Sequence, residues 1–404
     1  MKPGASTQPA PRPPLEGIRV IDASRVLAGP FCGSILADLG ADVVRMEHPT
    51  IRDEVRNWAP TVAGVSAAHI AVNHTKRSVA LDLAAPAGVA VFRRWIAQAD
   101  VLIENYRPGT LERYGVGSET LRALNPRLVH CSIRAYAAGT AAENLPGYEA
   151  AVQASTGVMS VTGENDGDPL RCGVSVLDIG TAMSGVIAVL AALRSRDQTG
   201  RGAHVEPALM RTAASFLNYQ IAGYGLAGVQ PKRFGSGHEA LVPYRNFNCA
   251  DGPLFIAAGN DRLWSRFCEA MQLADASGKL PWPTLADRIA AREAVNDRVA
   301  RTVAPLRRTD VQARLQAAGI PSSPVNTVAE FVDDPTLVPA GVIAPLAIPD
   351  VKTVDLAGPL FGADGLFATR RPPPAVGEHT EQVFGEIGVT AAELAALKQA
   401  PRTK

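Results

Sequence analysis

Short apolar segments alternate with longer helical ones through the first third of the chain, and no other feature limits the possible folds as much. Residues 17–23 (GIRVIDA) predict a buried strand, residues 30–39 a helix that Gly40 ends, and residues 41–47 (ADVVRME) a second strand. Because the links are short, the two strands are expected to lie parallel with a right-handed crossover between them.

The alternation continues as far as residue 133. Extended segments are predicted at 78–83, 101–104 and 128–133, with helices at 85–98 and 118–125 between them. This order favours an α/β fold with a doubly wound parallel sheet. Open sheets of this kind bind ligands beyond the carboxyl ends of their strands, so functional residues are expected just after the strands.

The middle of the chain has a different character. Helices are predicted at 178–196 and 208–223, and the following segment predicts a strand pair at 244–249 and 253–258 before helices rich in Arg and Ala. We therefore expect a second, smaller α+β domain at residues 225–325.

The two ends of the chain are rich in proline. The first 14 residues, MKPGASTQPAPRPP, lack an apolar segment, so a disordered tail is expected rather than a secretory signal. Beyond residue 340 the chain reads as loop until a helix at 390–399.

Composition excludes several classes of function. Lys and Arg number 40 against 39 Asp and Glu, a formal charge of +1, which favours neither nucleic acid nor a membrane surface. No stretch approaches 18 uncharged apolar residues, so no membrane span is expected. Five cysteines without a CxxC pair fit free thiols in a reducing cytoplasm. Seven scattered histidines give no support for a metal site.

Common nucleotide and hydrolase motifs are incomplete. Gly223-Tyr-Gly-Leu-Ala-Gly228 has the spacing of a dinucleotide fingerprint, but a helix rather than a strand precedes it, so a flexible helix exit is favoured. The segment 173–177 (GVSVL) lacks the second glycine of a nucleophile elbow, and no P-loop is found.

Asp178 lies at the start of the long apolar helix. The ordinary role of an aspartate there is to cap the helix by accepting backbone N–H bonds. The same position also keeps a carboxylate ionised and places N–H groups where an oxyanion can form, which suits a nucleophile. Spacing alone leaves both roles open.

Several cations follow or flank predicted strands. Residues 104–109 (ENYRPG) come directly after an apolar strand, and Lys76, Arg77 and Arg134 lie near other strand ends. Any one of them is more often a solvated surface charge than a ligand contact.

Eight segments, taken in order, resemble the class III CoA-transferase family, also called the CaiB/BaiF family. They are 15–22 (LEGIRVID), 26–30 (VLAGP), 36–47 (LADLGADVVRME), 73–78 (NHTKRS), 104–109, Asp178 with its helix, 199–202 (TGRG) and 377–380 (GEHT). Each is weak alone, but together they extend from about residue 15 to the carboxyl terminus.

The resemblance implies an architecture that the residues alone do not show. Family members pair a Rossmann-like large domain, here residues 15–210 and 335–404, with a small middle domain, and two chains interlock as a homodimer. Coenzyme A and its thioesters are then substrates rather than permanently bound cofactors.

The resemblance also implies a role for Asp178 as the nucleophile that forms a mixed anhydride and then an aspartyl-CoA thioester. Contacts with CoA are implied for Val26, Leu27, His48, Lys76, Arg77, Asn105, Tyr106, Arg107 and Arg134. Racemases of the same fold carry a Gly-His-Asp segment where this chain has 147–149 (GYE), which favours transfer over racemisation. A non-catalytic acyl-CoA binding protein is the remaining alternative.

The acids that exchange CoA are less well indicated. Residues 234–244 resemble a segment of members that use succinyl-CoA and a second dicarboxylate, with Gly235 and Gly237 as a possible lid and His238 near a remote carboxylate. An ordinary loop remains the alternative for all three. Residues 134–139 resemble the formyl-CoA/oxalate branch instead.

Overall fold

The computed structural model describes residues 12–274, 277–363 and 365–399, so the predicted tail lies outside it except for 12–14. The chain forms two compact units. Unit 1 comprises Met1–Thr156, Val174–Leu217 and Pro335–Lys404, and unit 2 comprises Gly157–Gly173 and Asn218–Asp334. The expected small domain, 225–325, falls inside unit 2. Residues 157–173 belong to unit 2 as well, although the sequence had placed them in the large domain.

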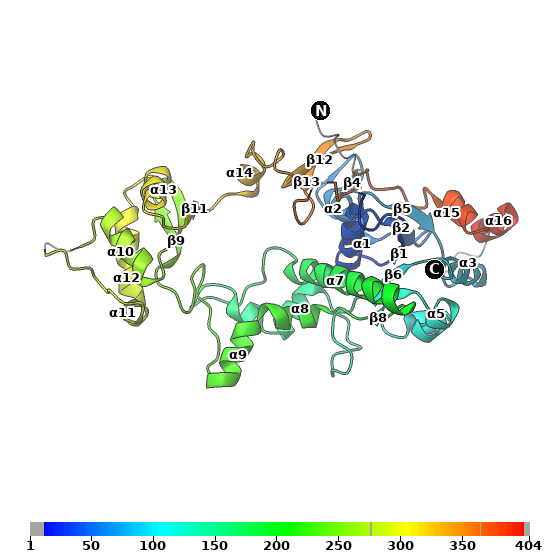
Figure 1. The fold of residues 1–404 in the computed structure, drawn as a ribbon, viewed down its shortest axis with the longest axis horizontal. Coiled ribbons are helices and arrows are strands. Elements are labelled where there is room, and N and C mark those ends of the chain that lie inside the picture. Colours follow the sequence, from blue (N-terminus) through cyan, green and yellow to red (C-terminus); the bar gives the residue numbers. More distant parts are fainter. Residues whose placement is uncertain (1–11, 275–276, 364, 400–404) are drawn as a thin grey trace, which may run out of the picture. The chain divides into compact units, whose positions relative to one another are not determined.

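Unit 1 is built on a six-stranded parallel sheet with the strand order β5-β2-β1-β6-β7-β8 (Figure 1). The strands are β1 (Arg19–Ala23), β2 (Asp42–Glu47), β5 (Arg77–Ala80), β6 (Val101–Glu104), β7 (Val129–Ser132) and β8 (His204–Val205). In the register, Ile21 of β1 lies beside Val44 and Leu102 of its two neighbours. The predicted α/β fold with a parallel sheet is confirmed.

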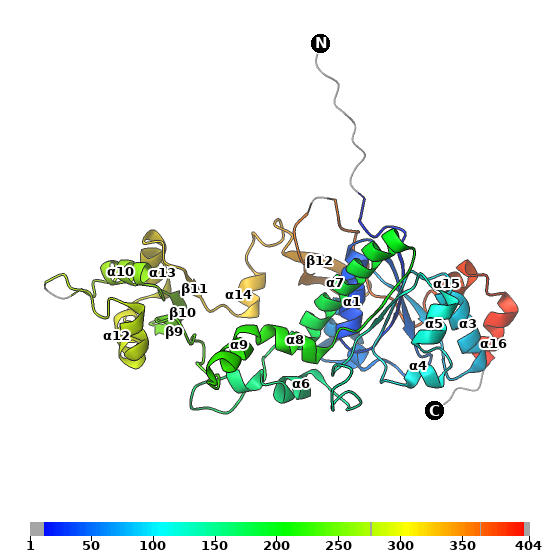
Figure 2. The ribbon, with the colours of Figure 1, turned by 60° about the horizontal axis from the view of Figure 1, so that its bottom comes forward.

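Helices cover both faces of this sheet (Figure 2). One face carries α1 (Ala28–Asp38), α2 (Ala67–Asn73) and α7 (Val176–Thr199). The other carries α3 (Pro86–Ile96), α5 (Ser118–Leu124), α15 (Thr380–Glu386) and α16 (Ala391–Gln399). Shorter elements of unit 1 are η1 (Glu54–Asn57), β3 (Thr61–Val62), β4 (Val65–Ser66), α4 (Thr110–Arg113), α6 (Glu149–Ser155) and α8 (Leu209–Phe216).

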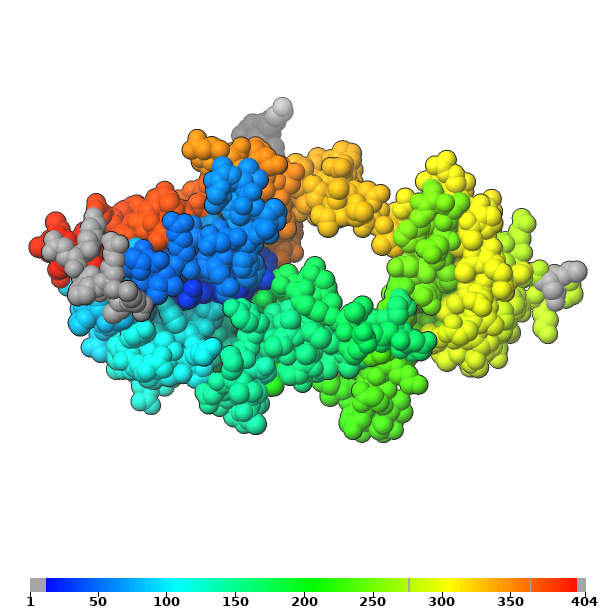
Figure 3. Space-filling model, turned by 180° about the vertical axis from the view of Figure 1, so that it is seen from behind, coloured from blue at the N-terminus to red at the C-terminus, as the bar shows by residue number. Residues whose placement is uncertain are grey.

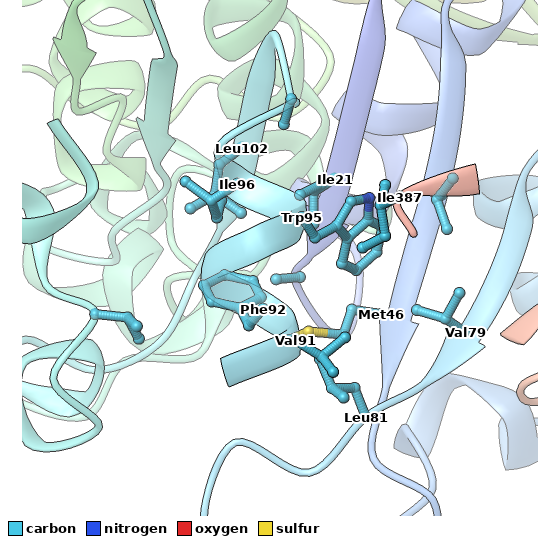
Figure 4. Packing of buried hydrophobic residues seen from close by; sticks show 14 of the residues in the cluster. Ile21, Met46, Val79, Leu81, Val91, Phe92, Trp95, Ile96, Leu102 and Ile387 are labelled. Atoms are coloured by element: carbon cyan, nitrogen blue, oxygen red, sulfur yellow. The ribbon is translucent and has the colours of Figure 1, made fainter. Parts of the chain in front are cut away.

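The face toward α3 is apolar. Ile21, Met46 and Val79 point from the strands into one cluster with Phe92 and Trp95 of α3 (Figure 4). Their strand neighbours point the other way because side chains alternate along a strand. This face is a conventional hydrophobic core, in which each fully buried large side chain contributes roughly 1.5–3 kcal/mol.

The end of the chain completes unit 1. Phe384 of α15 packs edge-on against Trp95, with ring centroids 5.8 Å apart. Figure 3 shows residues from the start of the chain, in blue, and from its end, in orange and red, on one surface of this unit.

The expectation of a loop beyond residue 340 is wrong. β12 (Ile343–Ile348) and β13 (Lys352–Ala357) form an antiparallel hairpin whose Leu346 and Leu356 pack on Ile70. Proline suggested loop, but a two-stranded hairpin has only edge strands, and these tolerate a residue without an N–H.

α7 passes the length and composition test for a membrane span, contrary to the sequence expectation. Its most apolar 18-residue window has a mean hydropathy of 2.0, and 44% of that window is buried inside the protein. Gly185 lets α7 lie close to α1, because an added Cβ would be 3.1 Å from the Sγ of Cys32 in that helix. A core helix packed in this way gives the same hydropathy, so the test carries no weight alone.

Unit 2 contains a three-stranded antiparallel sheet in the order β11-β10-β9, packed against helices. The strands are β9 (Tyr244–Cys249), β10 (Gly252–Ala257) and β11 (Ser322–Pro324), as the predicted strand pair anticipated. The helices are η2 (Met159–Val161), α9 (Asn218–Ala227), α10 (Asp261–Ala270), α11 (Leu285–Ala290), α12 (Arg292–Val303), α13 (Arg308–Ala317) and α14 (Val328–Val332).

Candidate active site

The loop between β1 and α1 has an unusual backbone. Val26 has a φ of +69°, a left-handed conformation that is strained for a β-branched residue. Leu27 follows as the N-cap residue of α1. Gly29 is required at this turn, because an added Cβ would lie 2.2 Å from the Oγ of Ser24. The VLAGP segment thus encodes a tight, specific turn at the carboxyl end of β1.

A network of buried charges lies beneath this turn, on the sheet face that carries α1 and α2. It contains three cations, Arg45, Arg56 and Lys76, and three carboxylates, Asp22, Glu47 and Asp53. Its formal charge is therefore zero. Pairing of this kind is needed because an isolated charge in the protein interior is very unfavourable.

The pKa values reflect this pairing. Burial lowers the pKa of Lys76 to about 8, although Asp22 acts in the opposite direction. For Glu47, burial would raise the pKa, but hydrogen bonds and charge from Arg56 and Arg45 outweigh it and lower the pKa to about 2. Both shifts show that the network depends on keeping all its members together.

Lys76 belongs to the interior of the protein. Its Nζ lies 2.8 Å from Asp22 Oδ2 and also donates to the carbonyl oxygens of Pro30 and Val72. Arg77, on the opposite face, pairs with Asp42 and with Glu386 of α15. Arg77 lies at the amino end of β5, whereas the ammonium of Lys76 is fully buried beneath the first turn of α1. The structure therefore does not support the expected CoA contacts of these two residues.

The segment after β6 is fixed to the β1–α1 loop. Asn105 donates from Nδ2 to the carbonyl oxygen of Arg25 at 2.8 Å and accepts the N–H of Arg25 at 2.9 Å. The Tyr106 ring packs partly into the apolar core, and Arg107 is exposed. The carboxyl ends of β1 and β6 thus form one continuous surface.

Buried Glu104 organises the next strand end. Its carboxylate accepts the N–H of Tyr106 at 2.8 Å and pairs with Arg134 at 3.1 Å. Burial would raise the pKa of Glu104, but His130 and Arg134 outweigh it and hold the pKa below its ordinary value. His130 also stacks on His204, with ring centroids 4.5 Å apart. This histidine pair could not be predicted from the sequence, because 74 positions separate the two residues.

His48 lies at the carboxyl end of β2. Its Nδ1 accepts the backbone N–H groups of Thr50 and Ile51, and its Nε2 lies 3.6 Å from Asp82 Oδ2. Asp82 lines a neighbouring cavity of about 370 Å³ together with Pro49. The ring is therefore held at the rim of a hollow on the ligand-binding edge.

Asp178 is the third residue of α7 and is half-buried. It is not the N-cap residue, since the helix begins at Val176 and Ser175 takes the capping position. Instead, the buried carboxylate of Glu149 accepts the N–H of Leu177 at 3.2 Å. Sequence reasoning missed Glu149, which lies 28 residues before its partner.

The start of α7 and the β1–α1 loop are neighbours. Leu27 and Ile179 line the same apolar cavity of about 250 Å³. On another side, the Tyr148 hydroxyl donates to Glu54 at 3.1 Å, and Glu54 follows Asp53 in the charged network. Figure 1 shows α1 and α7 side by side. The start of α7, which carries Asp178, thus lies beside the strained loop at the ligand-binding edge of the sheet.

Comparison with known proteins is decisive at this point. A model of CoA-transferase family III matches residues 15–380. The chain belongs to CoA-transferase family III.

Relatives of this family III protein agree over nearly their whole length. A succinate–glutarate CoA-transferase of Agrobacterium fabrum is 36% identical, covering 94% of this chain and 97% of its own. A succinyl-CoA:mesaconate CoA-transferase of Haloarcula hispanica is 34% identical, covering 93% and 96%. The crystal structure of a CaiB/BaiF family protein from Brucella suis superposes with a TM-score of 0.83 at 33% identity, covering 93% and 100%.

The remaining expected site residues of this family III enzyme lie in unit 2. Gly235 has a φ of +59° and donates its N–H to the carbonyl oxygen of Gly163, and Gly237 donates to Phe234. His238 Nδ1 accepts the N–H of Ala240, as expected for a residue that stabilises its own loop. The Gly235–Gly237 segment is therefore tied down by backbone hydrogen bonds within its own unit.

Proposed function

We propose that this enzyme transfers CoA from succinyl-CoA, or a similar dicarboxylyl-CoA, to a second carboxylic acid through covalent intermediates on Asp178. The observation that carries the proposal is the position of Asp178 in the first turn of α7, where its neighbour Ile179 lines one cavity with Leu27 of the β1–α1 loop. The names of its relatives support C5 dicarboxylates such as glutarate and mesaconate as acceptors.

The first half-reaction uses the Asp178 carboxylate as the nucleophile. One oxygen attacks the thioester carbonyl of the donor, the C–S bond breaks, and CoA leaves as a thiolate with a mixed anhydride on the enzyme. The thiolate then attacks the aspartyl carbonyl, releasing the donor acid and leaving an aspartyl-CoA thioester. Two covalent steps replace one difficult exchange.

The second half-reaction is the reverse with a new acid. The acceptor carboxylate attacks the aspartyl carbonyl and expels the thiolate, which then attacks the acyl carbonyl of the new anhydride. The products are the acceptor's CoA thioester and the free carboxylate of Asp178. Thioester energy is conserved throughout.

The fold supplies the electrostatic conditions for these steps. The positive end of the α7 dipole favours an ionised carboxylate at its first turn. The first N–H groups of α1, at Leu27, Ala28 and Gly29, have no carbonyl partner within the helix, so they can stabilise an oxyanion. Apolar side chains around the shared cavity help to exclude water, which would hydrolyse an anhydride.

CoA is placed along the carboxyl edge of the sheet in this proposal. Val26, Leu27 and the 105–107 segment would border the pantetheine and phosphates, with Arg107 and Arg134 as the cations nearest that path. His48, at the rim of its cavity, would lie at the adenine end. We propose that the carboxylic acid substrate is bound by Gly235, Gly237 and His238. A cytoplasmic, interlocked homodimer completes the proposal.

Mass spectrometry tests the reaction directly. Purified enzyme is incubated with succinyl-CoA and a panel of mono- and dicarboxylates, and new CoA thioesters are identified. Hydroxylamine added with succinyl-CoA is expected to convert Asp178 to a hydroxamate, located by peptide mapping. Asp178→Ala is expected to lose at least about 1,000-fold in turnover. Exchange that continues without any labelled Asp178 would exclude the covalent route, whereas deuterium uptake at the α-carbon without an acceptor would indicate a racemase.

A further inference from the structure

We infer that Asp53 is a positioning residue for the transfer reaction, because it holds Val26 in the left-handed conformation that directs the first N–H groups of α1. The inference rests on the proposed function, in which these groups face the thioester. It adds a residue from outside the loop itself, carried by the chain between β2 and η1.

The conformation of Val26 requires an explanation. A φ of +69° is easily adopted by glycine, whereas valine carries a Cβ with two methyl groups that crowd the backbone there. Strained residues of this kind persist only where the surrounding structure fixes them, and they cluster at functional sites. The strain therefore implies both a function for the conformation and a group that imposes it.

Asp53 is the group that imposes it. Its Oδ2 accepts the N–H of Val26 at 3.0 Å, and its side chain is only 3% exposed. The carboxylate also accepts the N–H of Val55 at 3.3 Å, which fixes its own orientation. A charge-assisted hydrogen bond shielded from water is strong enough to select one backbone conformation.

Arg45 holds the carboxylate from behind. Its guanidinium is fully buried, pairs with Asp53, and donates to Asn73 Oδ1 at 2.8 Å. Because Arg45 comes from β2, the position of Asp53 is defined by the sheet. The parallel sheet therefore fixes the position of the strained loop through Arg45 and Asp53.

The same turn also reaches the other side of the site. Glu54, the next residue, accepts a hydrogen bond from Tyr148, and Tyr148 precedes the Glu149 that binds the N–H of Leu177. One short segment therefore contacts both the loop before α1 and the chain that supports the start of α7. Because Asp53 and Glu54 contact both elements, this segment is expected to align the loop before α1 with the start of α7 and not only to stabilise the fold.

A glycine rescue tests this inference. Asp53→Ala is expected to lower kcat for succinyl-CoA:glutarate exchange on the order of tenfold to a hundredfold, because the loop relaxes away from the left-handed conformation. Val26→Gly added to Asp53→Ala is expected to restore part of that loss, because glycine adopts the conformation without help. In Asp53→Asn the side-chain oxygen can still accept the N–H of Val26, so its kcat is expected to lie between those of wild type and Asp53→Ala. Asp53→Asn replaces Asp53→Ala if the alanine variant does not fold.

Asp100 provides a matched control. Its carboxylate also accepts a backbone N–H, that of Arg19, and pairs with the buried Arg196, but at the amino end of β6. Asp100→Ala is expected to lower Tm without a large change in kcat, and Val26→Gly is expected not to help it.

The result that overturns the inference is clear. Either Asp53→Ala keeps a kcat close to wild type, or Val26→Gly restores nothing while the folded fraction is unchanged. A wild-type enzyme without exchange contradicts the proposed function instead. In that case the same variants are compared by calorimetry with succinyl-CoA as the probe, and equal affinity in wild type and Asp53→Ala would still overturn the role of Asp53.

Discussion

The two faces of the unit 1 sheet differ sharply, although both are buried. Toward α3 the strands present Ile21, Met46 and Val79, an apolar core. Toward α1 and α2, the alternate positions of the same strands present Asp22 and Arg45, which are fully buried charges. Parallel sheets covered on both faces normally read as continuous apolar runs, so the charged face requires another reason.

The reason is the loop that the charged face supports. The strained turn at Val26 and the start of α1 lie directly over it, held through Asp53 and Arg45. Apolar packing is non-directional, whereas hydrogen-bonded ion pairs fix orientation. The apolar face thus contributes to stability alone, whereas the charged face also fixes the geometry of the site. Substitutions on the two faces are expected to have different consequences.

The largest expected effect is on the charged face. Lys76→Met leaves Asp22 buried without the ammonium 2.8 Å away, so we expect a loss of about 3–5 kcal/mol in unfolding free energy. Urea denaturation followed by circular dichroism measures it. Adding Asp22→Asn to Lys76→Met removes the unpaired charge and is expected to recover part of the loss. A single variant that loses less than about 1 kcal/mol would show that the pair is not essential.

A pH effect of intermediate size is expected from Glu47. Its folded pKa of about 2 lies below the ordinary value of 4.5, so its contribution to stability is complete above pH 4.5 and disappears as the pH falls toward 2. The contribution is about 3 kcal/mol at most. The difference in unfolding free energy between wild type and Glu47→Gln, measured from pH 7 to pH 3, is expected to shrink below pH 4.5. A difference that stays constant over this range would contradict the pairing with Arg56.

The smallest effect is expected from Arg77, at the rim of the apolar face. Its partners Asp42 and Glu386 have side chains 40% and 47% exposed, so water screens both pairs. Arg77→Ala is expected to cost about 1 kcal/mol or less. The KM for acyl-CoA is expected not to change, because the side chain lies at the amino end of the sheet. A raised KM would instead support the contact between Arg77 and CoA that the sequence predicts.

The sequence predicted five of the six strands of the unit 1 sheet and several of its helices, because their signals are local. The strand at 101–104 and the helix at 118–125 follow from spacing and end residues, and both lie within a residue of the observed bounds. The hairpin at 343–357 was missed because Pro345 and Pro349 interrupt the segment and its apolar alternation is weak.

The site was predictable only where it lies next to a strand or helix end. Asp178 and Asn105 meet that condition, and the structure brings their surroundings to one edge of the sheet. Lys76 looked like a ligand contact because nothing in the sequence reveals that Asp22, 54 residues earlier, is its partner. Glu149 and Asp53 were missed for the same reason. Both act through backbone N–H groups far along the chain, which leave no pattern in the residues.

The placement of α15 also affects how the protein is made. Phe384 packs against Trp95. The ring of Trp95, which is synthesised early in translation, therefore stays uncovered until residues near the end of the chain have been made. Until then the nascent chain exposes a large aromatic patch, which makes chaperone binding and aggregation compete with folding. Carboxyl-terminal truncations that remove α15 should therefore harm solubility far more than their distance from Asp178 suggests.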